Sequence, residues 1–334
     1  MVVVLGAVLA LAPCPAFAQP PSWTFVWEND VVFGSDDDYT NGLRLSADFS
    51  KALWWKRWGL GYKNCSEETD VSKPCLRTTL MFGQNFYTPR DITVKQVQEG
   101  ERPYAAWLYG GFAGRVDRQT RLTSVELQIG TTGKAAHGKE VQTWFHSHLT
   151  TNSPIPKGWR NQVKPVPGGV GFIGSWDDRF AFPLKTHWLP RWVDERAIAY
   201  YRLTAGNVYT NAALGGTLRV GHNIQGWGTD KIAPTIRRAS DAAPRRFDEH
   251  LILNGFAGLE ARAVAWNALL QGATYTPRSP LAISRAVADF EAGVDVGYRP
   301  WSAGFRWVWR SGEFDGGRQS RFGGLFIRFA PGGS

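Results

Sequence analysis

Long segments in which apolar and polar residues alternate are the feature that most restricts the fold of this chain. In segment 289–298 the even positions are apolar and the odd positions are acidic or glycine. Segments 125–129 and 259–263 alternate in the same way, and in 305–310 aromatic residues face one way and arginines the other. Because successive side chains of a β-strand point to opposite faces, each segment is predicted to be a strand with one apolar face.

Two all-β architectures accommodate such strands, a soluble sandwich and a transmembrane barrel. The content of 16 Trp, 19 Phe and 10 Tyr suits either a sandwich core or the aromatic girdles of a barrel. The strand lengths favour the barrel, because the alternating segments reach about ten residues, as tilted membrane strands require. Tryptophans also cluster at predicted strand ends, with Trp54, Trp55 and Trp58 after one strand and Trp301 at the start of another.

We therefore predict an all-β fold, a single transmembrane antiparallel β-barrel with a short helix in an extracellular loop. Residues 19–334 form this one domain, since the chain shows no repeat, linker or low-complexity tract. Twelve strands are expected, an even number as in bacterial barrels. They cover 22–32, 39–50, 77–88, 103–115, 121–132, 165–180, 195–207, 211–224, 248–266, 283–298, 301–313 and 320–330.

The N-terminal residues 1–18 are predicted to be a secretory signal peptide. A short apolar run ends in Ala16-Phe17-Ala18, a small-residue pattern that places cleavage before Gln19. With the mature N-terminus in the periplasm, the connections at 33–38, 89–102 and 133–164 face outward. The chain is thus expected in the bacterial outer membrane.

Two cysteines remain after cleavage, Cys65 and Cys75, on either side of a polar segment. In an oxidising compartment they are expected to form a disulfide, with two free thiols as the alternative. The predicted topology places this loop on the periplasmic side of the barrel.

Oxygen-bearing side chains crowd the facing ends of the first two predicted strands. A hairpin there brings Asn29, Asp30 and Thr40 together. Carboxylate, amide and hydroxyl oxygens suit calcium better than zinc. An ordinary solvated turn is the alternative interpretation, because Asp, Asn, Ser and Gly are common turn residues.

The third outer connection contains a segment, residues 138–149, that is predicted to be a helix. Val141, Phe145 and Leu149 fall at i, i+4 and i+8 and form an apolar stripe that can dock on the barrel wall. Gln142 and His146, also four residues apart, lie beside this stripe and project together.

His146 is the candidate general base of this segment. A histidine at the edge of an apolar stripe near a membrane surface can exchange a proton with substrate or water. A surface or packing role is the alternative, and His148 is the rival histidine within the same segment.

Several short motifs resemble those of the outer-membrane lipid A 3'-O-deacylase family. They span residues 27 to about 160 in the expected order, whereas the C-terminal half matches only in its strand pattern. The motifs are Glu28-Asn29-Asp30, Asp38-Tyr39-Thr40-Asn41-Gly42, Gln84-Asn85-Phe86-Tyr87-Thr88-Pro89, Arg102-Pro103-Tyr104-Ala105-Ala106-Trp107-Leu108, Glu140-Val141-Gln142 with His146, and Pro156-Lys157-Gly158-Trp159.

The resemblance implies a twelve-stranded barrel with a calcium-dependent site between the outer wall and a short extracellular helix. It implies catalytic roles for Asn29, Asp30, Thr40, Gln142 and His146. The family also has a lysine in the second outer loop, for which Lys95 is the nearest candidate and Arg90 the next. A glutamate follows the family histidine, but its ungapped equivalent here is Asn152, which leaves Asp91 or Glu140 as the possible acid partner.

The expected reaction is hydrolysis of an acyl ester on lipid A. His146 takes a proton from water, a calcium ion held around Asn29, Asp30 and Thr40 polarises the carbonyl, and Gln142 and Lys95 position the substrate. The chain contains no G-x-S-x-G or H-E-x-x-H motif, so neither a serine hydrolase nor a zinc helix is indicated. The alternatives are a phospholipase-type acyl hydrolase, and a non-catalytic porin or surface-binding barrel.

The formal net charge of +9 is compatible with lipopolysaccharide, an anionic glycolipid, as partner. Nucleic acid is a poor candidate, because the chain is exported and its charge is dispersed. The basic residues of the outer loops are the candidate phosphate contacts, although lumen or solvent-facing roles are equally open. These residues are Arg90, Lys95, Lys134, Lys139, Lys157 and Arg160.

Overall fold

The structure is a computed structural model. It describes residues 20–30, 38–58, 61–66, 73–148, 154–184, 186, 189–190, 193–224, 227, 251–272 and 281–331. The predicted signal peptide, most of the turn at 33–38, Leu149 and Asn152 lie outside these residues. The signal peptide and the domain boundaries therefore stay predictions.

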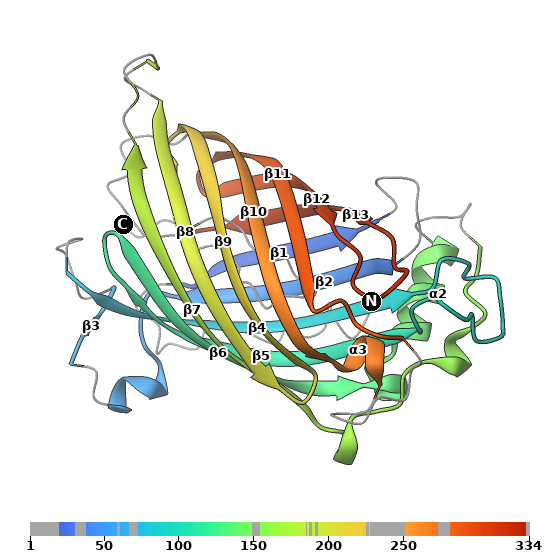
Figure 1. The fold of residues 1–334 in the computed structure, drawn as a ribbon. Helices are drawn as coiled ribbons and strands as arrows, with labels where there is room; N and C mark the ends of the chain where they lie inside the picture. The colour runs from blue at the N-terminus through green and yellow to red at the C-terminus, as the bar shows by residue number, and fades with distance from the viewer. Residues whose placement is uncertain are drawn as a thin grey trace.

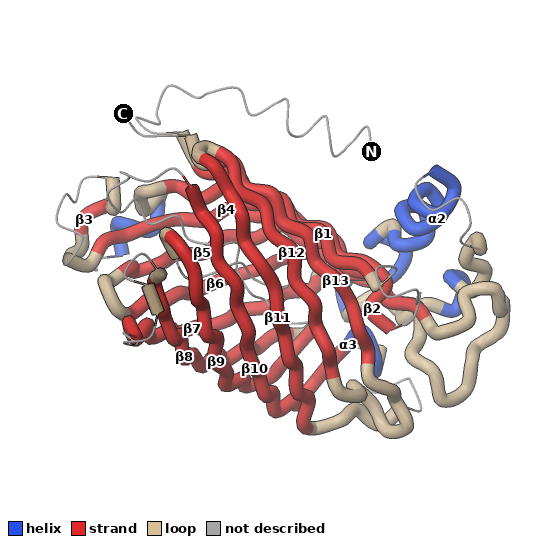
Figure 2. The backbone as a smooth tube through the Cα atoms, turned by 90° about the horizontal axis from the view of Figure 1, so that it is seen from above, coloured by secondary structure: helices blue, strands red, loops and turns tan. Residues whose placement is uncertain are grey.

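Twelve long antiparallel strands close into a single barrel (Figures 1 and 2). The ring closes where β2 pairs with both β1 and β4 and β1 pairs with β13. A thirteenth strand of the same sheet, β3 (Lys63–Asn64), pairs in parallel with the start of β4. The long strands are β1 (Ser22–Asn29), β2 (Asp38–Phe49), β4 (Cys75–Thr88), β5 (Ala105–Asp117), β6 (Arg121–Thr132), β7 (Gly171–Leu184), β8 (Asp194–Gly206), β9 (Tyr209–His222), β10 (Leu251–Asn267), β11 (Ala286–Tyr298), β12 (Trp301–Arg310) and β13 (Ser320–Phe329).

The predicted barrel with about twelve strands is confirmed, and most strand boundaries agree within a few residues. The largest difference is at β7, which begins at Gly171 rather than at 165. Pro165 and Pro167 precede it, and a proline has no backbone N–H to donate to a strand ladder. Residues Pro167–Gly169 form a short 3-10 helix, η5, instead.

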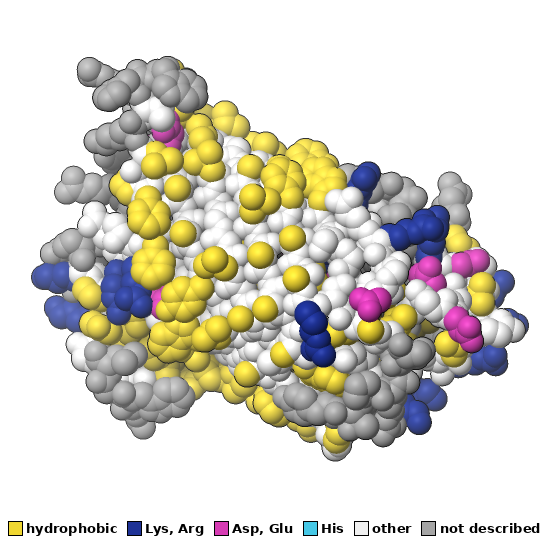
Figure 3. Space-filling model, in the orientation of Figure 1, with side chains coloured by type: hydrophobic (Ala, Val, Ile, Leu, Met, Phe, Trp, Pro, Cys, Tyr) yellow, Lys and Arg dark blue, Asp and Glu magenta, His cyan; other side chains and the backbone are white. Residues whose placement is uncertain are grey.

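The alternating pattern places apolar side chains on the outside and charged side chains in the lumen. In β11, Phe290, Val294 and Val296 are exposed on the outer wall, whereas Asp289 is buried in the lumen. Side chains of hydrophobic type cover much of the outer face (Figure 3). The outer wall of the barrel thus has the apolar character that a membrane-facing surface needs.

Charged side chains in the lumen pair with one another. The Asp289 carboxylate accepts two hydrogen bonds from Arg262, both of 2.9 Å, and two from Arg310, of 2.9 and 2.8 Å. All three side chains are almost completely buried. Because a buried charge is costly unless it is paired, these contacts compensate the burial of three charged groups on the neighbouring strands β10, β11 and β12.

Helices and connections gather at the two barrel ends. Helix α2 (Gly138–His148), the short helices η3 (Gly133–Ala136) and η4 (Trp159–Asn161), and α3 (Ala268–Gln271) lie at one end (Figure 1). β3 and η2 (Trp54–Trp58) lie at the other, together with the disulfide between Cys65 and Cys75. The predicted disulfide is confirmed. No helix among the described residues is long and apolar enough to cross a membrane.

Candidate active site

Helix α2 lies outside the barrel, across the ends of several strands (Figure 2). At its start, the Gln84 side-chain amide of β4 donates to the Ala136 carbonyl over 2.5 Å, which anchors the preceding turn. A Cβ atom on Gly138 would lie only 2.8 Å from the Cβ of Ala106 in β5. Near the other end, the rings of Phe145 and Trp27 of β1 lie 6.0 Å apart. The helix therefore crosses the wall from β5 to β1.

The helix face turned to the wall is the polar one. Gly138, Gln142 and His146, at i, i+4 and i+8, are the buried residues of α2, whereas Val141 and Phe145 are only partly buried. The prediction that the apolar stripe forms the docking face is thus only partly right. The absence of a side chain at Gly138 explains the difference, because it lets the backbone approach Ala106 and Trp159 closely.

Gln142 is completely buried and held by one hydrogen bond. Its Oε1 accepts from Trp159 Nε1 over 2.7 Å. The Trp159 ring is itself fixed, with its centroid 5.0 Å from that of Tyr104 and 6.4 Å from that of Phe86. Among the described residues, Gln142 Nε2 has no hydrogen-bond partner. The amide is therefore oriented so that its two N–H groups remain available to a ligand.

His146 is held in one orientation by a backbone carbonyl. Its Nδ1 lies 2.8 Å from the Pro154 oxygen, and only 5% of the residue is exposed. Because a carbonyl can only accept, Nδ1 carries the hydrogen and the lone pair of the neutral ring lies on Nε2. This is the protonation pattern that a general base acting through Nε2 requires.

A row of buried residues lies on the wall beneath the helix. Asn29 of β1 faces Asn41 of β2, Asn41 faces Phe86 of β4, and Phe86 faces Ala106 of β5. Directly opposed residues project from the same face of a sheet, and Asn29 shares the face of Trp27, two residues earlier. The two asparagines therefore lie on the side of the wall that α2 covers.

Of the other two residues of the predicted cation site, Asp30 and Thr40, only the side chain of Asp30 is described. Asp30 follows β1 and is 1% exposed. Thr40 belongs to β2, but its side chain lies outside the described residues. The structure thus places Asn29 beside α2. Asp30, the next residue in the sequence, is buried.

Asn41 is a candidate that the sequence reasoning missed. It is 1% exposed, and within the described part of the chain its Oδ1 has no hydrogen-bond partner. The register of β2 against β4 shifts between Asp38 and Asn41, and such a bulge re-aims the side chains around it. Tyr39 accordingly points into the lumen, where its hydroxyl donates to Glu28 over 3.0 Å.

The donor set of this site fits a hard cation. In the described ranges, no group of three or more His, Cys, Asp or Glu side chains is placed to bind a metal. The oxygen-bearing side chains here are instead the amides of Asn29 and Asn41 and the carboxylate of Asp30, groups of the kind that calcium accepts as ligands. A buried amide oxygen without a donor, as in Asn41, is the type of group that a bound cation satisfies.

Lys95 lies in the connection between β4 and β5, and its side chain is exposed. Its carbonyl oxygen accepts a hydrogen bond of 2.7 Å from Asn161 Nδ2, which ties this loop to the helix η4 that carries Trp159. Arg90 is exposed as well. Lys95 therefore lies on the solvent side of the site, and neither basic residue belongs to the buried row.

Neither acid considered as the partner of His146 takes its Nδ1 hydrogen. Asp91 accepts from the hydroxyl and the backbone N–H of Thr93, over 2.6 and 2.9 Å. These bonds hold the pKa of the Asp91 carboxyl below its ordinary value. Glu140 is exposed and lies 3.9 Å from His137. The Pro154 carbonyl accepts the Nδ1 hydrogen instead.

The family model described as outer membrane protein LpxR matches residues 3–330. This chain belongs to the LpxR family. Its structure is similar to that of LpxR from Salmonella typhimurium, with a TM-score of 0.72 and 20% sequence identity over 92% of this chain and 99% of that one. The two proteins thus share the barrel fold.

More distant barrels are also similar. The β domain of the Bordetella autotransporter Brka has a TM-score of 0.45 and 11% identity, with 94% of this chain and 99% of that chain covered. The translocator domain of the autotransporter NalP from Neisseria meningitidis has a TM-score of 0.42 and 9% identity, with coverage of 98% and 93%. No curated protein sequence matches the chain significantly.

Membership of the LpxR family agrees with the resemblance of the N-terminal motifs and makes the chain an outer-membrane protein. The family and the shared barrel support an outer-membrane lipid A deacylase. In the predicted topology, the end that carries α2 faces outward.

Proposed function

We propose that this LpxR-family barrel is a lipid A 3'-O-deacylase that hydrolyses an acyl ester in the outer leaflet with a water activated by His146. One observation carries the proposal: His146 and Gln142 are buried on the face of α2 that covers the outer wall, opposite Asn29 and Asn41. Buried polar side chains on a membrane-facing wall are costly unless they serve a ligand or a reaction.

His146 supplies the base in this mechanism. Its Nε2 lone pair takes a proton from water while the water oxygen attacks the ester carbonyl carbon. When the tetrahedral oxyanion collapses, the sugar oxygen leaves and Nε2 returns the proton to it. The hydrogen bond from Nδ1 to the Pro154 carbonyl, 2.8 Å long, holds the ring in place and stabilises the imidazolium between these steps.

Gln142 is proposed to bind the carbonyl oxygen of the substrate. Its Oε1 is held by Trp159 over 2.7 Å, so the amide nitrogen is the group left for a ligand. An oriented N–H donor in a buried site stabilises the negative charge that develops in the transition state.

Calcium is the proposed cofactor, with Asn29, Asp30 and Thr40 as ligands and Asn41 as an additional one. When bound, a calcium ion polarises the ester carbonyl and stabilises the oxyanion. The buried amide oxygen of Asn41 supports this ligand set, because no donor among the described residues satisfies it. The carboxylate of Asp30 supplies negative charge beside the amide ligands.

Exposed basic residues at the outer end are proposed to contact the phosphates of lipid A. Several Lys and Arg side chains lie at the helical end of the barrel in Figure 3, among Asp and Glu side chains, and others lie at the opposite end. Lys95 belongs to this group, since its side chain is exposed beside η4. A role in binding the phosphates therefore suits Lys95 better than a role at the reacting bond.

A passive porin is less well supported than an enzyme. The Asp289, Arg262 and Arg310 side chains of the neighbouring strands β10 to β12 are buried and paired, whereas a conducting channel leaves its lining charges in water. Hydrolysis of a phospholipid at the same site is the remaining enzymatic alternative, because it needs the same base and carbonyl contacts.

The decisive experiment is incubation of the purified barrel with lipid A, with calcium or with a chelator, followed by mass spectrometry of the products. Loss of one ester-linked acyl chain only with calcium is expected. Phospholipid is tested in parallel, and its cleavage in place of lipid A contradicts the proposed substrate. An absence of any hydrolysis, with conductance in planar bilayers, favours the porin.

A further inference from the structure

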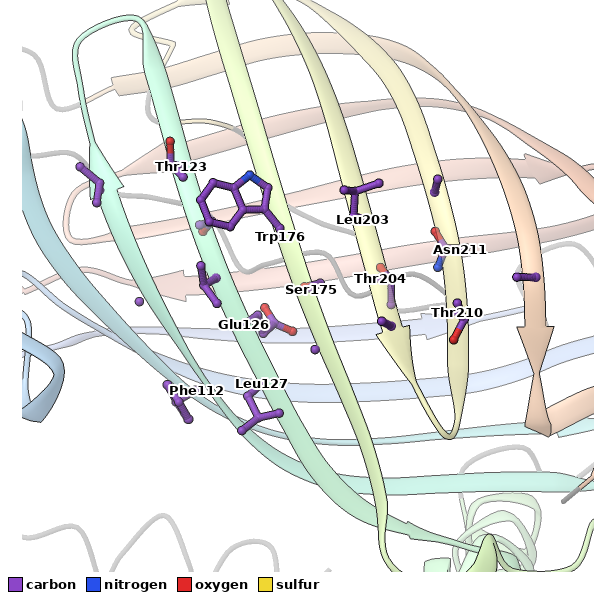
Figure 4. A pocket seen from close by; sticks show the side chains of 18 of the residues that line it. Phe112, Thr123, Glu126, Leu127, Ser175, Trp176, Leu203, Thr204, Thr210 and Asn211 are labelled. Atoms are coloured by element: carbon purple, nitrogen blue, oxygen red, sulfur yellow. The ribbon is translucent and has the colours of Figure 1, made fainter. Parts of the chain in front are cut away.

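A large groove crosses the outer wall of the barrel, away from α2 (Figure 4). Its volume is about 1320 Å³, and it extends over the outward faces of strands β5 to β10. Exposed apolar side chains line it, including Trp176 of β7 and Leu203 of β8. A groove of this kind on a membrane-facing wall is in contact with lipid.

Small outward-facing residues explain the hollow. Gly174 and Ala205 stand in the groove between larger neighbours such as Leu127 and Leu203. A Cβ atom on Gly174 would meet only the Ala205 carbonyl oxygen, at 3.7 Å. The backbone there does not need glycine for close packing, so the missing side chain leaves open space.

Each end of the groove carries an arginine. At the end on the side of α2, Arg285 donates from Nη1 to the backbone carbonyls of Val264 and Ala265, over 3.4 and 2.7 Å.

The other end is polar and positively charged as well. Arg118 lines this end, where it donates from Nη1 to the Thr123 hydroxyl over 3.2 Å and lies 5.8 Å above the Tyr62 ring. The carboxylate close by, Asp178, is bound by Arg121 through two hydrogen bonds of 3.1 and 3.0 Å. Among the described residues, Arg118 therefore keeps a positive charge with no carboxylate partner.

The position of Arg118 identifies the leaflet. It lies in the short connection between β5 and β6, at the end of the barrel opposite α2. Since α2 marks the outer surface, Arg118 lies at the periplasmic boundary of the membrane. A ligand that reaches both Arg118 and the apolar groove must combine a phosphate at this boundary with a hydrocarbon chain inside the membrane.

We propose that the groove binds a phospholipid of the periplasmic leaflet, with its phosphate on Arg118 and one acyl chain along Phe112, Leu127 and Leu203. The charge of Arg118 and the apolar lining match the two parts of this ligand. Lipid A also combines phosphates with acyl chains, but its headgroup lies at the other surface, where the arginine of the groove, Arg285, already donates from Nη1 to two backbone carbonyls. Lipid A is therefore titrated beside the phospholipids in the test. The site is separate from the proposed catalytic site and does not depend on its chemistry.

Two pairs of variants test the groove and its charged end. Gly174→Phe places a large side chain in the groove. Gly255→Phe, on the outward face of β10, is the matched control. A Cβ atom there would meet only the Gly293 oxygen, at 3.9 Å. Arg118→Ala removes the charge, and Arg299→Ala is its control in the turn between β11 and β12, outside the groove. Heat-modifiable migration of each barrel confirms that it has folded.

The measurement is native mass spectrometry of the full barrel in mild detergent, titrated with phosphatidylethanolamine, phosphatidylglycerol or lipid A. We expect one phospholipid per wild-type barrel and about tenfold weaker binding to the R118A and G174F variants, the loss expected for one hydrogen-bonded charge or a blocked chain. G255F and R299A should bind as the wild type does. Equal binding by G174F and the wild type, an equal loss in the controls, or preferential binding of lipid A each overturns the proposal.

Discussion

The Nδ1 atom of His146 donates a hydrogen bond to the backbone carbonyl of Pro154 over 2.8 Å. This contact fixes the ring on the buried face of α2. It also leaves the basic lone pair on Nε2, the nitrogen that the proposed mechanism uses.

Replacing His146 with Ala is expected to lower the rate of lipid A deacylation by about a hundredfold or more, because general base catalysis typically contributes that much. The rate is measured with purified, folded barrel by mass spectrometry of lipid A. His148→Ala is the matched control, since His148 is exposed, stacks on Trp144 and bonds its carbonyl. An H146A variant as active as H148A would refute the assigned base.

Trp159 is expected to act as a positioning residue through Gln142. Trp159→Phe keeps an aromatic ring against Tyr104 but removes the donor to Gln142 Oε1. A buried acceptor without its donor costs about 1–3 kcal/mol, and the freed amide rotates, so kcat should fall about tenfold. KM should change little, because the wall and the outer loops still bind the substrate.

Steady-state kinetics of W159F alongside Gln142→Ala separate this role from simple packing. If Trp159 acts only through the amide, the double variant is no slower than Q142A alone. An additive loss would mean that Trp159 acts independently of Gln142.

The fold could be predicted from the sequence because alternate residues of a barrel strand face the apolar outside and the polar lumen. Segment 289–298 illustrates this: Phe290 and Val294 face outward, while Asp289 finds its arginine partners in the lumen. Strand ends were less predictable. The start of β7 at Gly171 depends on how the prolines before it pack, which a two-residue period does not encode.

The site was predictable only where its residues stand in local motifs. Helical spacing predicted that Gln142 and His146 project together, and both are buried in α2. Asn41 could not be found in this way, because its position opposite Asn29 follows from the β2 register and a bulge. The carbonyl partner of His146 comes from Pro154, and a backbone acceptor leaves no signal in a residue pattern.

Lys95 is expected to affect substrate binding more than the chemical step. Its side chain is exposed at the border of the site, so Lys95→Ala should raise KM about fivefold and leave kcat nearly unchanged, as the loss of a surface phosphate contact does. Arg90→Ala in the same assay tests the rival residue. Lys63→Ala is the control, because Lys63 is exposed on β3 at the opposite end. A loss of kcat in K95A would instead place this lysine at the reacting bond.

The disulfide between Cys65 and Cys75 is expected to stabilise the barrel without affecting deacylation. The bond closes a loop with a sequence separation of 10 residues, at the end opposite α2. In the chain-entropy model a loop of this size contributes about 2–3 kcal/mol. Replacing both cysteines with Ser should lower the free energy of unfolding by that amount, measured by urea unfolding in lipid vesicles. Reduced wild type should match the variant, and equal stability of the oxidised and reduced forms would contradict the expectation.

Asn41 gives the sharpest test of the calcium site, because its amide oxygen is buried and accepts no hydrogen bond from the described residues. Asn41→Ala should weaken cation binding about tenfold, as expected when one ligand oxygen is lost. Terbium luminescence excited through nearby tryptophans such as Trp27 reports binding without any turnover. Asn85→Ala is the matched control, since Asn85 lies beside Phe86 in β4 but on its lumen face. If N41A and N85A bind terbium as tightly as the wild type while D30N does not, Asp30 belongs to the cation site and Asn41 does not.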